Sequence, residues 1–96
     1  MVVERKRDEY YTIFDMEMED FVLSATYLNP HKSTVGHQHP WSEAYYIAIG
    51  FGKIIIGREI KDATEGDFIR IPANIFHQVF NLGTFPMRFV CAWREK

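Results

Sequence analysis

His37, His39 and Glu43 are the residues whose types and spacing best suit chemistry in this sequence. On an extended backbone, residues two apart point to the same side, so the two imidazoles share a face. Glu43 joins that face if the chain stays extended through residues 40–42. Imidazole nitrogens and a carboxylate oxygen are ligands for divalent ions such as Zn, Fe, Mn, Ni, Co or Cu. The segment therefore predicts part of a site for one divalent transition metal.

A His-x-His pair alone has an ordinary explanation, because histidines often serve as surface or hydrogen-bonded core residues. Two further features favour metal binding. Glu43 has the right phase, and His77 opens a later apolar segment, where it is the candidate for a fourth ligand. Four protein ligands on a six-coordinate ion still leave room for water or a substrate.

Three neighbouring residues are candidates for a substrate pocket. Tyr45 lies on the face of Glu43, where its hydroxyl could bind a substrate or take part with Glu43 in proton transfer. The alternative is a core tyrosine with a satisfied hydroxyl. Trp41 could form the pocket rim or simply cover the core. Asn81 could line the pocket or only close a turn.

Short β-branched and aromatic runs, separated by Gly, Pro and Asn, indicate the elements that must position these side chains. No long stretch has the apolar spacing of an amphipathic helix. The expected strands span residues 10–14, 21–28, 43–49, 53–56, 67–71, 76–80 and 87–93. Many short strands at close spacing predict an all-β, antiparallel sandwich or barrel. The 96 residues suffice for one domain, with residues 1–9 as a flexible tail or an edge strand.

Two motifs stand in order along the chain. The first is His37, one residue, His39, three residues, Glu43, six residues and then Gly50. Glycine at that last position allows the tight reversal after the strand that carries Glu43.

The second motif is Gly66, five residues, Pro72, one residue, Asn74, two residues, His77, three residues and Asn81. Fifteen residues, 51 to 65, separate the two motifs. In composition, order and spacing the pair resembles the two motifs of the cupins, and the resemblance covers about residues 21 to 94.

The resemblance implies a cupin jelly-roll β-barrel in which His37, His39, Glu43 and His77 are the metal ligands. The sequence departs from the family pattern at two glycine positions. Six residues before His37, where the family pattern has a glycine, this chain has His31. This histidine could be an acid or base at the pocket edge or an exposed loop residue. The inner glycine of the second motif is Asn74, the residue best able to replace glycine at positive φ.

Composition limits the choice of partners and location. A formal net charge of −2 gives no electrostatic reason to expect nucleic acid as a partner. No stretch approaches the length of a membrane-spanning helix, and the N-terminus lacks the apolar segment of a signal peptide. Cys91, the single cysteine, is expected to be a buried thiol. We therefore expect a cytoplasmic protein without a membrane partner. Its small size and strands that are apolar on both faces favour a homodimer.

Two classes of function remain open, because a fold alone does not determine chemistry. The first is a metal-dependent enzyme on a small polar metabolite, either a sugar or sugar-phosphate isomerase or a dioxygenase. The Glu43-Ala44-Tyr45 arrangement resembles that of cupin-type phosphoglucose isomerases, although many cupins share it. The second class is a non-catalytic module that binds a small molecule, such as a carbohydrate or an effector.

Overall fold

The computed structural model describes residues 1–95 and contains nine β-strands and no helix in that range. No helix of the described chain is therefore long and apolar enough to cross a membrane. The strands are β1 (Val2–Arg7), β2 (Tyr11–Glu17), β3 (Val22–Leu28), β4 (Glu43–Ile49), β5 (Phe51–Ile56), β6 (Glu59–Thr64), β7 (Phe68–Ile71), β8 (His77–Asn81) and β9 (Met87–Trp93).

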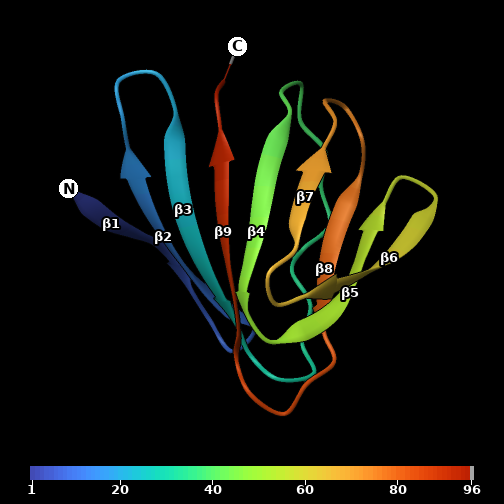
Figure 1. Ribbon diagram of the computed structural model, residues 1–96. Helices are drawn as coiled ribbons and strands as arrows, with labels where there is room; N and C mark the ends of the chain where they lie inside the picture. The colour runs from blue at the N-terminus through green and yellow to red at the C-terminus, as the bar shows by residue number, and fades with distance from the viewer. Residues whose placement is uncertain (96) are drawn as a thin grey trace.

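The strands form two antiparallel sheets, which Figure 1 shows as the two sides of an open bowl. The larger sheet has the order β1-β2-β3-β9-β4-β7 and the smaller one the order β6-β5-β8. The last strand, β9, therefore lies between β3 and β4. The expected antiparallel cupin architecture is confirmed. Within residues 1–95, however, no continuous ladder of paired strands closes the barrel, because the two sheets hydrogen-bond separately.

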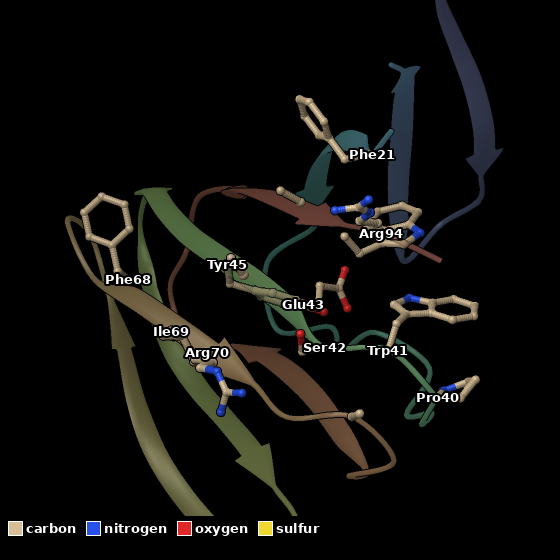
Figure 2. Close-up of a pocket in the computed structure, with 14 residues that line it drawn as sticks. Phe21, Pro40, Trp41, Ser42, Glu43, Tyr45, Phe68, Ile69, Arg70 and Arg94 are labelled. Carbon is tan, nitrogen blue, oxygen red and sulfur yellow. The ribbon is translucent and has the colours of Figure 1, made fainter. Parts of the chain in front are cut away.

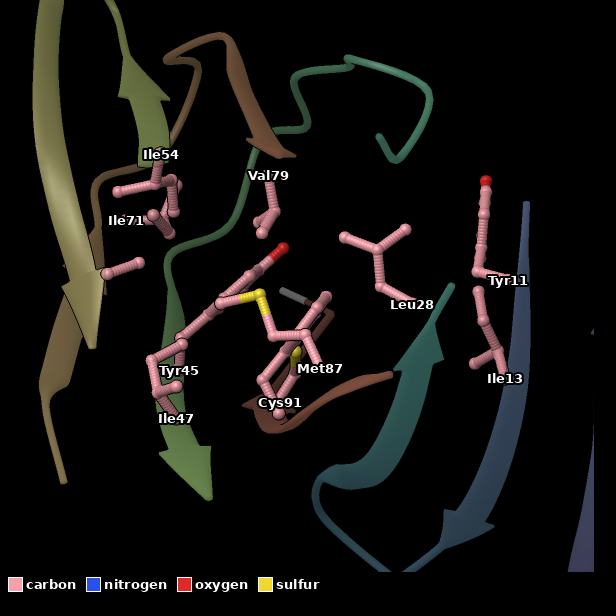
Figure 3. Packing of buried hydrophobic residues seen from close by; sticks show 12 residues of the cluster. Tyr11, Ile13, Leu28, Tyr45, Ile47, Ile54, Ile71, Val79, Met87 and Cys91 are labelled. Atoms are coloured by element: carbon pink, nitrogen blue, oxygen red, sulfur yellow. The ribbon is translucent and has the colours of Figure 1, made fainter. Parts of the chain in front are cut away.

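The core lies between the inner faces of the two sheets (Figure 3). Ile47 and Ile71 come from the larger sheet, Ile54 and Val79 from the smaller one, and all four are fully buried. Burial of such a side chain contributes about 1.5–3 kcal/mol relative to leaving it in water. This packing holds the first residues of β4 and β8, Glu43 and His77, close to each other.

At two turns, Asn74 and His31 stand where the family motifs have glycine. Asn74 has φ 63°, as its place in the second motif predicts, and His31 has φ 61°. Both residues thus adopt the left-handed conformation that glycine would otherwise supply, and Asn and His are enriched there among non-glycine residues. The backbone of both turns is therefore kept despite the substitutions.

Two strands extend beyond the seven that the sequence indicated. Strand β6 is exposed along most of its length and carries Glu59, Lys61 and Asp62, so it lacks the apolar alternation that marks a strand. Strand β1 lies in the segment expected to be a flexible tail or an edge strand; it is the edge strand of the larger sheet and is also mostly exposed. Both are held by pairing with a neighbouring strand, which a local pattern does not reveal.

Candidate metal centre

The four residues proposed from the sequence come together at one end of the molecule. One possible ligand atom from each of His37, His39, Glu43 and His77 lies within 4.8 Å of the others. His77 and Glu43 are only 2% and 8% exposed, whereas His37 lies at the surface. A cluster of this kind could hold a metal ion, with the buried ligands anchored in the strands and His37 toward solvent.

Backbone pairing places the histidines. His37 precedes β4 but forms an isolated antiparallel bridge with His77 of β8, with N···O distances of 3.1 and 2.9 Å. The backbone N–H of Asn74 donates to the carbonyl of His39 at 2.7 Å. The segment that carries His37 and His39 is therefore tied to β8 and to the turn before it, while Glu43 belongs to the larger sheet.

Glu43 was expected to share the face of the histidines on the condition that the chain stays extended through residues 40–42, and this condition is not met. Residues 40 and 41 form a bend, and β4 begins only at Glu43. Pro40 cannot donate a ladder hydrogen bond, which favours the break. Glu43 still reaches the histidines, since the bend returns the chain toward them.

Hydrogen bonds fix the protonation pattern of two rings. Nδ1 of His39 donates to the carbonyl of Trp41 at 2.8 Å, and Nδ1 of His77 donates to the carbonyl of Ile75 at 3.1 Å. A carbonyl only accepts, so in the neutral rings these nitrogens carry the hydrogen and Nε2 keeps its lone pair. Such backbone partners orient histidine ligands in metal sites.

The Nε2 atoms converge with the carboxylate. His39 Nε2 lies 3.0 Å from Glu43 Oε1, His77 Nε2 lies 3.5 Å from the same oxygen, and the Nε2 atoms of His37 and His77 are 3.0 Å apart. Adjacent ligands on an ion with bonds of about 2.1 Å are separated by about 3.0–3.4 Å. Although His37 lies at the surface, partial burial of its ring, followed by the neighbouring imidazoles of His77 and His39, lowers its pKa and favours its neutral, metal-binding form. The donor set thus fits a divalent transition metal.

The sequence comparison agrees with this geometry. The family model described as a cupin domain matches residues 26–93. The chain belongs to the cupin family. No curated protein matches the sequence of this cupin.

Solved structures resemble this cupin in fold. Rru_A2000 from Rhodospirillum rubrum, a cupin-2 domain, superimposes with a TM-score of 0.86 at 16% identity over 100% of this chain and 70% of that one. The plu4264 protein from Photorhabdus luminescens gives 0.82 at 23% identity over 93% and 78%. Oxalate decarboxylase from Bacillus subtilis gives 0.86 at 17% identity, over 93% of this chain and 26% of that one.

Trp41 and Tyr45 lie beside the four-residue cluster of this cupin. The indole of Trp41 stacks on the imidazole of His39, with centroids 4.8 Å apart and planes at 9°. Tyr45 is buried, stacks on Phe89 at 5.4 Å and meets the ring of His77 edge-on at 6.0 Å. Burial, and then the nearby Cys91 and Glu43, raise the pKa of Tyr45, so its hydroxyl stays protonated.

Asn81 is placed differently. It is 1% exposed, and its Nδ2 donates to the carbonyls of Leu28 and Phe85 at 2.9 Å and of Asn29 at 3.3 Å. Its Oδ1 accepts from the N–H of Gly83 at 2.8 Å. The structure therefore shows Asn81 tying the end of β3 to the loop between β8 and β9, at the opposite end of β8 from His77. His31 is exposed and outside the cluster.

A cavity of about 360 Å³ opens onto the cluster and is lined in part by His37, His39 and Glu43. Trp41 is also among its lining residues. Its other lining residues are Arg5, Asp15, Glu17, Val22, Gln38, Trp93 and Glu95. Most of these come from β1, β2, β3 and β9, which the sequence argument did not connect with the site. These residues reach the cavity only because their strands pair side by side in the larger sheet.

A second cavity, of about 790 Å³, runs along the end of β4 between β7 and β9 (Figure 2). In Figure 2, Phe68 and Arg70 stand on one side of it and Phe21 and Arg94 on the other. Phe68 is 83% exposed and packs against the ring of Tyr46 at 4.7 Å. This is an apolar area on the outside of the larger sheet.

Proposed function

We propose that this cupin binds one divalent transition metal through His37, His39, Glu43 and His77 and is a metal-dependent enzyme on a small polar metabolite. The observation that carries the proposal is the convergence of four donor atoms within 4.8 Å, next to a cavity large enough for a small molecule. The fixed Nδ1 hydrogens of His39 and His77 support it, because they leave both Nε2 lone pairs for the ion.

When bound, such an ion polarises a carbonyl or hydroxyl oxygen of the ligand. The protein groups then bind and orient that ligand. Trp41, held flat against His39, offers an apolar wall, and the carboxylate of Glu43 and the protonated hydroxyl of Tyr45 are the groups proposed to move a proton. Sugar or sugar-phosphate isomerisation and dioxygenation are the two forms of this proposal. Only dioxygenation consumes oxygen, so an oxygen electrode separates them.

The test of the metal site is elemental analysis of protein purified without chelator. We expect about one equivalent of a transition metal in the natural protein and a large loss in His39→Asn. His31→Asn is the matched control, because His31 lies outside the cluster and Asn tolerates its positive φ. Equal metal content in all three proteins would refute the proposed ligand set.

The same protein tests the alternative of a non-catalytic binding module. Metal-loaded protein that binds a small ligand, yet turns over none of a panel of sugars, sugar phosphates and oxygen-consuming substrates, would favour the binding module over the enzyme. We place either form in the cytoplasm, since Cys91 is a free, buried thiol and needs no oxidising compartment.

We also propose that the protein is a homodimer. The support is the exposed Tyr46–Phe68 pair beside the 790 Å³ cavity on the outside of the larger sheet. A second copy seated on this area would remove its apolar surface from water. Light scattering at high protein concentration tests the proposal, and a monomer would refute it.

A further inference from the structure

The outer face of the larger sheet, which points away from the core, is apolar across five strands. Residues at paired positions share a face, so the register from β2 through β3, β9 and β4 to β7 sets two rows of side chains on it. In that order the rows are Met16, Leu23, Ala92, Ala44 and Arg70, and Phe14, Ala25, Val90, Tyr46 and Phe68. All of these residues are exposed or half-buried, and Arg70 is the one that carries a charge.

This face is large enough for a stable interface with a second copy. The 790 Å³ cavity extends it by a further row, at Phe21 and Arg94. Strands lie about 4.8 Å apart and side chains on one face repeat about every 6.8 Å, so five strands and three rows cover about 500 Å². Two such faces bury about 1,000 Å² together, the size at which specific interfaces begin. An apolar patch of this extent on a monomer commonly marks an interaction site.

Free charges of opposite sign lie at one end of this face. Arg70 and Arg94 line the 790 Å³ cavity, are exposed and form no ion pair within residues 1–95 (Figure 2). Glu19 and Asp20 lie in the hairpin between β2 and β3, are also exposed and likewise lack an ion pair in that range. The cavity therefore offers cations, and the hairpin offers carboxylates.

A two-fold axis along the strands brings the hairpin and the cavity together. An axis midway between β3 and β9, the centre of the six-stranded sheet, sets β3 of one copy over β9 of the other and β2 over β4. The hairpin and the start of β4 lie at the same end of the sheet, so the hairpin of each copy covers the cavity of the other (Figure 1). Both contacts are then identical, as a two-fold dimer requires, and the sheets pack face to face in the aligned manner.

The apolar parts of the hairpin and the cavity also match. Met18 and Phe21 flank the two carboxylates and are 46% and 39% exposed. The cavity presents the small side chains of Ala44 and Ala92 beside Phe68, and these leave room for a hairpin tip. The contact would thus remove apolar surface from water on both copies while it pairs their charges.

We infer that two copies of this cupin pack the outer faces of their larger sheets together, each inserting its β2–β3 hairpin into the 790 Å³ cavity of the other, where Glu19 and Asp20 meet Arg70 and Arg94. The inference rests on the proposed homodimer and names the surface that forms it. Glu43 lines the same cavity, so the hairpin of the second copy would cover the outer side of the metal centre.

Two charge-reversed variants test the contact by sedimentation. Arg70→Glu/Arg94→Glu makes the cavity acidic, and Glu19→Arg/Asp20→Arg makes the hairpin basic. Each variant alone sets like charges against each other, so we expect its dimer dissociation constant to rise about hundredfold. In a 1:1 mixture the basic hairpin meets the acidic cavity and the acidic hairpin meets the basic one. We expect the mixture to dimerise within about tenfold of the natural constant and to weaken in high salt.

A double reversal on the other sheet is the control. Glu59→Arg/Asp62→Arg changes the net charge as much as the hairpin variant does, at exposed positions of β6 in the smaller sheet. It is expected to keep the natural dissociation constant. Dimerisation of the mixture also shows that both cavity and hairpin variants are folded.

The outcomes separate the interface from the homodimer itself. If the natural protein is a monomer at high concentration, the proposed homodimer and this inference fall together. If the natural protein is a dimer and both variants alone dimerise as well as it does, the homodimer stands and uses another surface, which overturns the inference. Variants that stay monomeric after mixing would refute the pairing of hairpin and cavity.

Discussion

Replacing Asn81 by alanine tests whether this residue is a structural link or a ligand contact. Its side chain makes three hydrogen bonds of 2.8–2.9 Å, to the carbonyls of Leu28 and Phe85 and from the N–H of Gly83. At about 1 kcal/mol for each net bond, the variant loses about 3 kcal/mol of unfolding free energy. For a domain of this size that corresponds to a fall in Tm of about 12–24 °C.

The assay is urea unfolding followed by tryptophan fluorescence, together with the metal content of the folded protein. Asn29→Ala is a suitable control, because its Nδ2 makes one exposed bond to the carbonyl of Glu9 and should lose at most about 1 kcal/mol. We expect Asn81→Ala to be destabilised with its metal content kept. A loss below about 1 kcal/mol, with weakened ligand binding, would show that Asn81 belongs to the pocket and that our reasoning is wrong.

Four further outcomes are expected. Chelation should lower the Tm of the natural protein but not that of the His39→Asn variant. Burial raises the pKa of Cys91, so a thiol reagent should label it only after unfolding, and labelling of native protein at pH 8 would contradict this. If the proposed homodimer forms, Phe68→Lys should make the protein monomeric in light scattering without changing Tm by more than a few degrees. Gly52→Ala should reduce the yield of folded protein, because the added Cβ would lie 1.9 Å from the carbonyl oxygen of Phe80.

The clustering of the four candidate ligands could be predicted from the sequence because the pattern that indicates it is local. His37, His39 and Glu43 fall within seven residues, and the spacing from Gly66 to His77 places the fourth candidate on its own strand. The turn at Asn74 could also be predicted, since few residues other than glycine accept its φ. These features do not depend on knowing which strands are neighbours.

The wall of the 360 Å³ cavity that β1 and β2 build could not be predicted in this way. Arg5, Asp15 and Glu17 reach the cavity only because β1 and β2 extend the larger sheet beyond β3. Their segments are rich in charged residues, as a solvent-exposed strand edge is, and nothing local distinguishes a charge facing a cavity from one facing bulk water. Pairing along the whole sheet decides the difference, and a single sequence does not state that pairing.

A metal bound by the four proposed ligands would have a structural role as well as a chemical one. Glu43 begins β4 in the larger sheet, His77 begins β8 in the smaller sheet, and no continuous ladder joins the two sheets within residues 1–95. An ion held by both residues would connect the sheets at the open end of the bowl (Figure 1). Because such an ion binds the folded chain in preference to the unfolded one, its binding free energy adds to stability. The site and the fold of this small domain should therefore weaken together when a ligand is removed.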